Sequence, residues 1–200
     1  MAKFILFLTD RPCSTAPRPS HRIDGHFRGP DGVGNLHLEP APPEHLPYSV
    51  REVKFHHAAI TLVGSLLVPR TPGKHVGVVL LHRSGPENRW DTPRFIAVRI
   101  ARAGIVALIY DKRGSDSSTG SLDSFVYADL AGDAVAGVRF LALQSEVDSR
   151  RVGLLGHSEG GITGVVAAAL APRDSPSLLR KIRWQGRYIN LISAASEHVT

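Results

Sequence analysis

The pattern of hydrophobic and polar positions changes near residue 48 of this 200-residue chain. Before that point prolines and glycines are frequent, and the apolar residues follow neither a two-residue nor a 3.6-residue period. Such a segment lacks the periodic apolar face that a packed strand or helix needs. Residues 1–47 are therefore expected to be an irregular leader, and residues 48–200 to form one globular domain.

Short apolar runs of strand length follow one another through the expected domain. The first two predict a hairpin, because the earlier run alternates between apolar and polar residues and the later one is closed by Pro69. The next runs are continuously apolar, which is typical of strands buried on both faces of a sheet. The predicted strands comprise residues 50–55, 61–68, 76–81, 105–110, 151–155 and 188–192.

The stretches between these runs have helical spacing at residues 91–103, 123–143 and 159–170. Strands that alternate with helices in this way predict right-handed βαβ units. The expected fold class is α/β, with a mostly parallel, doubly wound sheet, helices on both of its faces and an antiparallel leading edge.

The chain has a formal net charge of +6, which is compatible with an acidic partner. One local patch combines cations with aromatic rings, a mixture that can hold single-stranded nucleic acid by charge and stacking. Because the other cations are scattered, a solvated surface is the favoured interpretation and a basic binding module is the alternative; no nucleic-acid partner is expected. The patch consists of Arg180, Lys181, Arg183, Trp184, Arg187 and Tyr188.

Composition excludes several other classes of protein. No apolar run approaches the ~20 residues of a membrane-spanning helix, so no membrane partner is expected. The apolar core of residues 4–8 is too short for a signal peptide, which leaves the cytoplasm as the expected location. The single cysteine, Cys13, excludes an intramolecular disulfide and a cysteine-based zinc cluster, and no metal or cofactor is expected.

The sequence Gly156-His157-Ser158-Glu159-Gly160 matches the pattern G-x-S-x-G. It lies between a predicted buried strand and a predicted helix of small residues, which is the context that a nucleophile elbow requires. In such an elbow the glycines allow a sharp turn that exposes a strained serine. The alternative is an accidental turn serine, but the context favours Ser158 as a nucleophile with Gly156 and Gly160 as elbow glycines.

Three segments resemble the bacterial α/β-hydrolases of the dienelactone hydrolase and prolyl oligopeptidase-like group. They are VVLLHRSGPENR (78–89), IVALIYDKRGSDSSTG (105–120) and DLAGDAVAGVRFLALQSEVDSRRVGLLGHSEGG (129–161), and the likeness covers about residues 48–171. The resemblance implies an α/β-hydrolase fold and a serine esterase that cleaves an ester, thioester or similar acyl bond of a small molecule.

The resemblance also implies roles for individual residues. Ser158 matches the nucleophile, and the backbone N–H of Glu159 matches one donor of the oxyanion hole. The second donor is expected at Arg83 or Ser84, in the loop after the strand 76–81. The family usually has glycine where this chain has Arg83, and an arginine there is expected either to crowd the oxyanion pocket or to force the loop out of a conformation that only glycine adopts. His82 is expected to hold this loop in place.

Other polar residues near these motifs are interpreted as structural. The turn Asp111-Lys112-Arg113-Gly114 follows the strand 105–110 and is expected to hold loops together. His157 is expected to pack or orient the elbow rather than act as the base. His56 and His57 are expected on the surface of an edge strand, with a metal-binding pair as the alternative.

The catalytic acid and histidine expected after the nucleophile are missing from the pattern. In this fold the triad runs from serine to an acid and then to histidine. Beyond Glu159 the acids are Asp174 and Glu197, the remaining histidine is His198, and none has the expected placement. The domain is therefore expected to be incomplete at its C-terminal end, through a shortened or frame-shifted reading frame or as a compact variant. Impaired catalysis or an inactive fragment, and self-association through an exposed sheet edge, are expected consequences.

Overall fold

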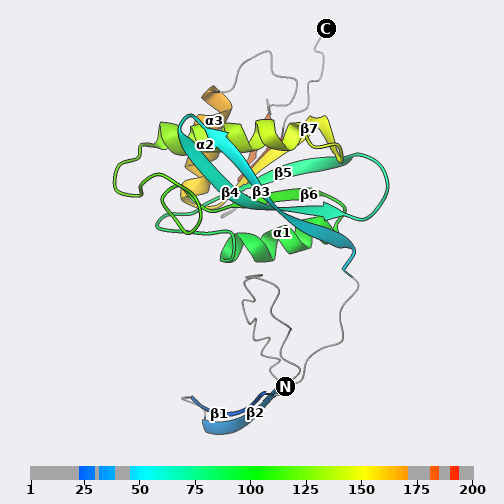
Figure 1. The fold of residues 1–200 in the computed structure, drawn as a ribbon, viewed down its shortest axis with the longest axis vertical. Coiled ribbons are helices and arrows are strands. Elements are labelled where there is room, and N and C mark those ends of the chain that lie inside the picture. The colour runs from blue at the N-terminus through cyan, green and yellow to red at the C-terminus, as the bar shows by residue number, and fades with distance from the viewer. Residues whose placement is uncertain (1–22, 30–31, 39–45, 171–180, 185–189, 194–200) are drawn as a thin grey trace. The chain divides into compact units, whose positions relative to one another are not determined.

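The computed structural model describes the stretches 23–29, 32–38, 46–170, 181–184 and 190–193, with side chains in 33–35 and 46–170. The chain divides into two units, Met1–Leu46 and Pro47–Thr200. Figure 1 shows the fold of each unit.

The first unit contains a β-hairpin. Strand β1 (Ile23–Gly29) pairs with the antiparallel strand β2 (Gly32–Leu38), with Ile23 opposite Leu38 and Gly29 opposite Gly32. This differs from the irregular leader expected over residues 1–47. A signal for it is present, because the sequence Gly-Pro-Asp-Gly at 29–32 is typical of a tight turn, but the flanking residues have no apolar period.

The second unit is built on a sheet with the strand order β3-β4-β6-β5-β7-β9-β8. β5 is parallel to both β6 and β7, whereas the remaining pairs are antiparallel. Within the described sheet, β4 and β9 therefore run opposite to the other strands. The strands are β3 (Tyr48–His57), β4 (Ile60–Pro69), β5 (His75–Leu81), β6 (Val106–Tyr110), β7 (Val147–Gly156), β8 (Lys181–Trp184) and β9 (Asn190–Ser193).

Helices cover both faces of this sheet. α1 (Thr92–Arg102) lies on one face, and α2 (Tyr127–Ala142) and α3 (Glu159–Leu170) lie on the other (Figure 1). The chain passes from β5 to β6 and then back across β5 to β7, and right-handed crossovers in opposite directions place their helices on opposite faces. The α/β-hydrolase architecture expected from the sequence is thus present, with its antiparallel leading pair β3 and β4.

The order of the strands also predicts where a ligand binds. The carboxyl ends of β5 and β7 lie side by side, but the helices that follow these two strands pack on opposite faces of the sheet. Such a switch point opens a crevice above the sheet, where ligands bind in open α/β folds. The loop after β5 and the turn after β7 both lie at this point.

Apolar side chains from the strands and from α2 form the core beneath this switch point. Strand β6 is buried along its whole length, which confirms the interpretation of its continuous apolar run. Leu66, Val79, Leu108 and Val138 belong to the same buried cluster. The site therefore rests on strands that are packed on both faces.

The strand predicted at residues 188–192 corresponds to β9 on the C-terminal side of the sheet, where it runs antiparallel to its neighbour β7. β9 pairs with β7, with Gly156 opposite Asn190, and β8 covers β9 in turn. Part of the basic patch, Lys181 to Trp184, forms β8, whereas Arg180, Arg187 and Tyr188 lie outside the described residues. No helix in the described part of the chain is long and apolar enough to span a membrane.

Candidate active site

The turn between β7 and α3 holds Ser158 in a strained backbone conformation. β7 ends at Gly156, α3 begins at Glu159, and Ser158 between them has a φ of 57°. Residues other than glycine seldom adopt this left-handed region, and in folded proteins such strain clusters at functional sites. The side chain of Ser158 is exposed at the switch point of the sheet.

Two glycines let this turn approach the rest of the fold. A Cβ atom at position 156 would overlap the carbonyl group of Gly160. A Cβ atom at position 160 would lie 2.8 Å from the carbonyl oxygen of His82, at the end of β5. Gly156 and Gly160 therefore lie where the expected elbow glycines have to be, and they allow α3 to start against the loop after β5.

The loop after β5 distinguishes the two candidate oxyanion donors. The backbone N–H of Arg83 donates to Oε2 of Glu87 at 2.8 Å, and Arg83 Nε donates to Oε1 of the same carboxylate at 3.0 Å. Glu87 is buried, and its carboxylate already accepts the hydrogen bond of the Arg83 N–H, so this N–H is not available to an oxyanion. Among the described residues, by contrast, the backbone N–H groups of Ser84 and Glu159 have no hydrogen-bond partner.

Lys112 connects that loop to the elbow. Its Nζ donates to the carbonyl oxygens of Arg83 at 3.3 Å and Gly85 at 3.2 Å, and to Oε2 of Glu159 at 2.5 Å. The side chain is 1% exposed, and Nζ lies 5.2 Å from the centre of the Phe125 ring. From the sequence we predicted a structural role for the turn that contains Lys112, but not that this residue contacts the elbow.

His82 fastens the start of the loop to the neighbouring strand. Its Nε2 lies 2.6 Å from the carbonyl oxygen of Tyr110, at the end of β6. Burial lowers the pKa of His82 to about 4, the bond to Tyr110 opposes this effect, and the charge of Lys112 adds to it. A neutral imidazole that donates through Nε2 fits the expected role of holding the loop.

Arg89 and Asp111 fasten the far end of the loop. The N–H and Nη1 of Arg89 donate to the two carboxylate oxygens of Asp111 at 2.9 and 2.8 Å. Burial raises the pKa of Asp111, and its bonds with Arg89 oppose that shift. Asp111 thus has the structural role expected for this turn.

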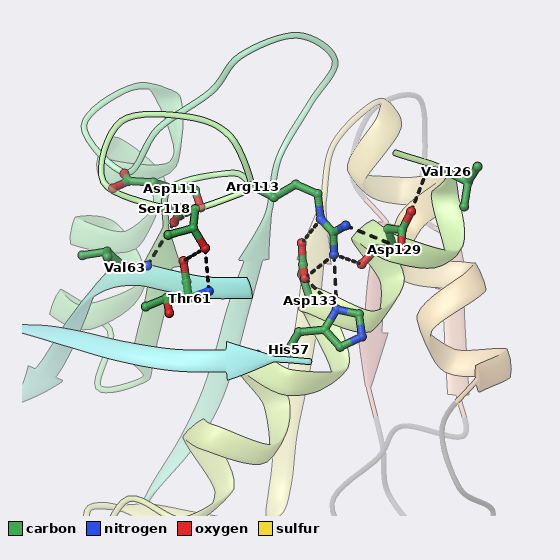
Figure 2. A network of polar contacts seen from close by, with 10 residues as sticks. His57, Thr61, Val63, Asp111, Arg113, Ser118, Val126, Asp129 and Asp133 are labelled. Atoms are coloured by element: carbon green, nitrogen blue, oxygen red, sulfur yellow. Dashed lines mark hydrogen bonds and ion pairs between the residues drawn. The ribbon is translucent and has the colours of Figure 1, made fainter. Parts of the chain in front are cut away.

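Arg113, the next cation of the turn, faces Asp133, Asp129 and His57 (Figure 2). Its Nε and Nη2 donate to the Asp133 carboxylate at 2.7 and 2.8 Å, and this hydrogen bond raises the pKa of Arg113. His57 Nδ1 lies 2.8 Å from the same carboxylate, and Asp129 is 3.5 Å from Arg113 Nη1. These four residues are called the Arg113 cluster below.

The Arg113 cluster corrects the expectation for His57. Rather than lying on the surface, this residue is half-buried, and its ring occupies the space that a side chain at Gly132 of α2 would need. His56 instead lies 3.2 Å from the hydroxyl of Thr61. Across the described residues, no group of three or more His, Cys, Asp or Glu side chains is arranged to hold a metal ion.

No general base contacts Ser158 within the part of the chain that the structure describes. Neither a histidine nor a carboxylate of that part is hydrogen-bonded to its hydroxyl, and the neighbouring His157 is exposed. Asp174, Glu197 and His198 lie outside the described residues.

A cavity of about 120 Å³ adjoins the elbow on the α1 side of the sheet. Its wall is largely apolar, and the polar side chains of Arg83 and Glu87 contribute to it as well. The cavity connects the loop after β5 with the residues that precede Ser158. Its lining comprises Leu80, Leu81, Arg83, Glu87, Thr92, Pro93, Ile96, Leu155, Gly156 and His157.

The sheet has crossover connections, helices cover both of its faces, and a serine in a strained turn follows β7. This combination defines an α/β-hydrolase. Residues 44–188 match the model of the X-Pro dipeptidyl-peptidase (S15) family. The match spans well over half of the chain, which therefore belongs to this family.

The relatives include esterases. Esterase EstD of Thermotoga maritima is 31% identical over 126 residues, which is 58% of this chain and 30% of EstD. The chain therefore spans less than a third of the length of this relative. The resemblance to serine esterases of the α/β-hydrolase superfamily is thereby confirmed.

Solved structures show the same fold. Acetyl xylan esterase 1 from Thermoanaerobacterium sp. JW/SL YS485 has a TM-score of 0.53 and 21% identity, over 68% of this chain and 49% of that one. The dienelactone hydrolase-like promiscuous phosphotriesterase P91 from metagenomic libraries has a TM-score of 0.50 and 24% identity, over 61% of this chain and 54% of that one.

Proposed function

We propose that this chain hydrolyses carboxylic esters of small molecules, with Ser158 as the nucleophile. The observation that supports this proposal most strongly is the backbone of Ser158, whose φ of 57° presents the hydroxyl at the switch point of the sheet. A serine in this conformation, between a buried strand and a helix, is the arrangement of a nucleophile elbow. The esterases among the relatives support ester hydrolysis as the reaction.

The proposed reaction has two steps. Ser158 Oγ forms a bond to the carbonyl carbon of the ester, the bond to the alkoxy oxygen breaks, and the hydroxyl proton ends on the departing alcohol. Water then attacks the acyl-serine, which releases the carboxylic acid and restores the Ser158 hydroxyl. Both steps pass through a tetrahedral intermediate that carries negative charge on the former carbonyl oxygen.

We assign the oxyanion donors to the backbone N–H groups of Glu159 and Ser84. Arg83 is the less suitable donor, because its N–H is bound to the Glu87 carboxylate. Glu159 directly follows the nucleophile, and Ser84 lies in the loop that contacts the start of α3 through Gly160. Two donors without a partner in the described residues meet the requirement for binding an oxyanion.

The cavity beside the elbow favours a substrate that carries a small apolar group. It has a volume of about 120 Å³, and its wall is largely apolar. A short alkyl or acyl chain fits such a space and gains by leaving water. The Arg83 and Glu87 side chains at its wall bind each other, so they leave little net charge for selecting a charged substrate.

An inactive hydrolase scaffold is the second candidate, because the described residues bring no base to Ser158. An enzyme of this type that lacks its base keeps about 10³–10⁴-fold acceleration over water through its oxyanion site and binding alone. The rate of turnover therefore distinguishes the two candidates.

Hydrolysis of p-nitrophenyl acetate and butyrate by the full chain tests the proposal. We expect turnover that is lost in Ser158→Ala, while Ser117→Ala, which changes a serine of the turn after β6, retains it. Turnover equal to that of Ser158→Ala, in a chain that is folded by circular dichroism, would establish the inactive scaffold. Cleavage of an Xaa-Pro p-nitroanilide in place of the esters would assign the site to peptides.

A further inference from the structure

We propose that Lys112 is a positioning residue that holds the two oxyanion donors, Ser84 N–H and Glu159 N–H, at a fixed separation. The proposal rests on the function assigned to Ser158. Lys112 is the buried cation whose ammonium group contacts both segments that carry these donors. The loop after β5 and the elbow are far apart in the sequence, and Lys112 adds side-chain hydrogen bonds to the close approach of Gly160 to His82.

The first contact orients the Ser84 donor. The carbonyl oxygen of Arg83, which accepts a hydrogen bond from Lys112, belongs to the same peptide group as the N–H of Ser84. The described residues contain no cis peptide, and a trans peptide points its C=O and N–H in opposite directions. By holding this carbonyl, Lys112 turns the Ser84 N–H away from itself. The bond to Gly85 O fixes the next part of the loop in the same way.

The second contact fixes the elbow. Lys112 Nζ lies 2.5 Å from Oε2 of Glu159, whose side chain is 11% exposed. Glu159 is the first residue of α3, and its own N–H is the other proposed donor. A charge-assisted bond with both partners removed from water is strong and geometrically demanding. It therefore resists movement of the start of α3 relative to the loop.

The hydrogen-bond count gives Lys112 a role in positioning rather than in contact with the substrate. An ammonium group has three N–H donors, and Lys112 has three acceptors: Arg83 O, Gly85 O and Glu159 Oε2. All of its donors are used within the protein, so none remains for the substrate. Its effect on the reaction passes through the peptide groups that it holds.

Comparison of Lys112→Met with the wild-type chain and with Lys54→Met tests the proposal. Methionine retains the length of the side chain but removes the three donors, and Lys54 is an exposed lysine on β3. The first readout is the rate constant for reaction of Ser158 with a fluorophosphonate, together with kcat and KM for p-nitrophenyl acetate. The second is hydrogen exchange of residues 82–88 and 157–161.

We expect Lys112→Met to react with the fluorophosphonate about 100-fold more slowly, because small displacements of positioned groups have effects of this size. kcat should fall while KM changes little, since the donors bind the charge that develops during the reaction. Exchange should rise in both segments, and Lys54→Met should match the wild type in every readout.

A Lys112→Met chain that reacts at the wild-type rate would overturn the proposal and leave Ser158 as the nucleophile. A wild-type chain whose Ser158 does not react would overturn the proposed function and with it the catalytic role of Lys112. If Lys112→Met does not fold, Glu159→Gln replaces it as the test, because glutamine keeps the size of the side chain and removes the ion pair. We expect a rate lower by about 10-fold, as for a charge-assisted bond made neutral, and an unchanged rate would overturn the proposal.

Discussion

Two consecutive cations at the end of β6 serve different parts of the molecule. Lys112 contacts the loop after β5 and the elbow. Arg113 instead points to Asp133 of α2 and to His57 at the end of β3 (Figure 2). Each cation is buried and pairs with a carboxylate, Glu159 in one case and Asp133 in the other. Their surroundings nevertheless differ.

The difference lies in the groups next to each ion pair. Around Lys112 are the exposed, strained Ser158 and two backbone N–H groups without a partner in the described residues. Around Arg113 the guanidinium and the His57 ring both bind the Asp133 carboxylate. A buried ion pair alone therefore does not identify a functional site; strained backbone and unpaired donors beside it do.

The largest effect of a substitution is expected on stability, at the Arg113 cluster. Arg113→Met leaves the Asp133 carboxylate buried without its cation, which should lower the free energy of unfolding by about 3–5 kcal/mol. Urea denaturation measures this loss. Replacing both partners, as in Arg113→Met/Asp133→Leu, should recover most of it. Ser158 in the folded fraction should react as in the wild type, and a slower reaction would show that the two clusters are coupled.

A smaller loss of stability, with a larger loss of reactivity, is expected at the elbow. The Cβ of Gly160→Ala would lie 2.8 Å from the backbone oxygen of His82, so α3 has to shift. We expect the free energy of unfolding to fall by about 1–3 kcal/mol, as for other overpacked sites. Fluorophosphonate labelling should fall with it by at least 10-fold. Gly73→Ala is the control, because a Cβ there meets no neighbour although φ is positive. We expect it to strain the backbone far from the elbow and to leave labelling unchanged.

His82 should make stability depend on pH. Its folded pKa of about 4 lies below the ordinary value of 6.5, so the unfolded chain binds more protons between these values. The contribution of His82 to the free energy of unfolding therefore has its full value above pH 6.5. It decreases as the pH falls toward 4, by roughly 1 kcal/mol per pH unit. His82→Gln retains a donor for Tyr110 O and does not titrate, so its stability should change less between pH 7.5 and pH 5. Equal changes in the two proteins would contradict the burial of a neutral His82.

The smallest effect is expected at the exposed rim of the Arg113 cluster. Asp129 is 3.5 Å from Arg113 with 40% of its side chain exposed, and such pairs contribute less than about 1 kcal/mol. Asp129→Asn retains an acceptor for the N–H of Val126 and should change the urea midpoint only slightly, as should the exposed Asp123→Asn. A loss as large as that of Arg113→Met would mean that the cluster depends on its rim.

The elements of the sheet could be predicted because their signals are local. Apolar runs predicted β5 and β6, and the pattern around Ser158 predicted the turn between β7 and α3. The limits of the elements were less certain: β7 begins at Val147 rather than 151, because the polar residues 148–151, of which 149–151 are exposed, separate the buried Val147 from the apolar run that follows.

Contacts between distant residues could not be predicted in this way. Lys112 and Glu159 are 47 positions apart, and His57 and Asp133 are 76 apart, so neither pair forms a motif. The choice between Arg83 and Ser84 also depended on a side chain, because only the position of Glu87 shows which N–H is occupied. Parallel β5, β6 and β7 explain why residues after these strands meet at one edge, but not which of them bind.

Peptide mapping by mass spectrometry, after the full chain has reacted with a fluorophosphonate, tests most directly whether Ser158 is the nucleophile. We expect one covalent adduct, on Ser158 in the peptide that contains Gly156 to Gly160, and no adduct at that position in Ser158→Ala. An unmodified Ser158 in folded protein, or an equal adduct on another serine, would contradict this expectation.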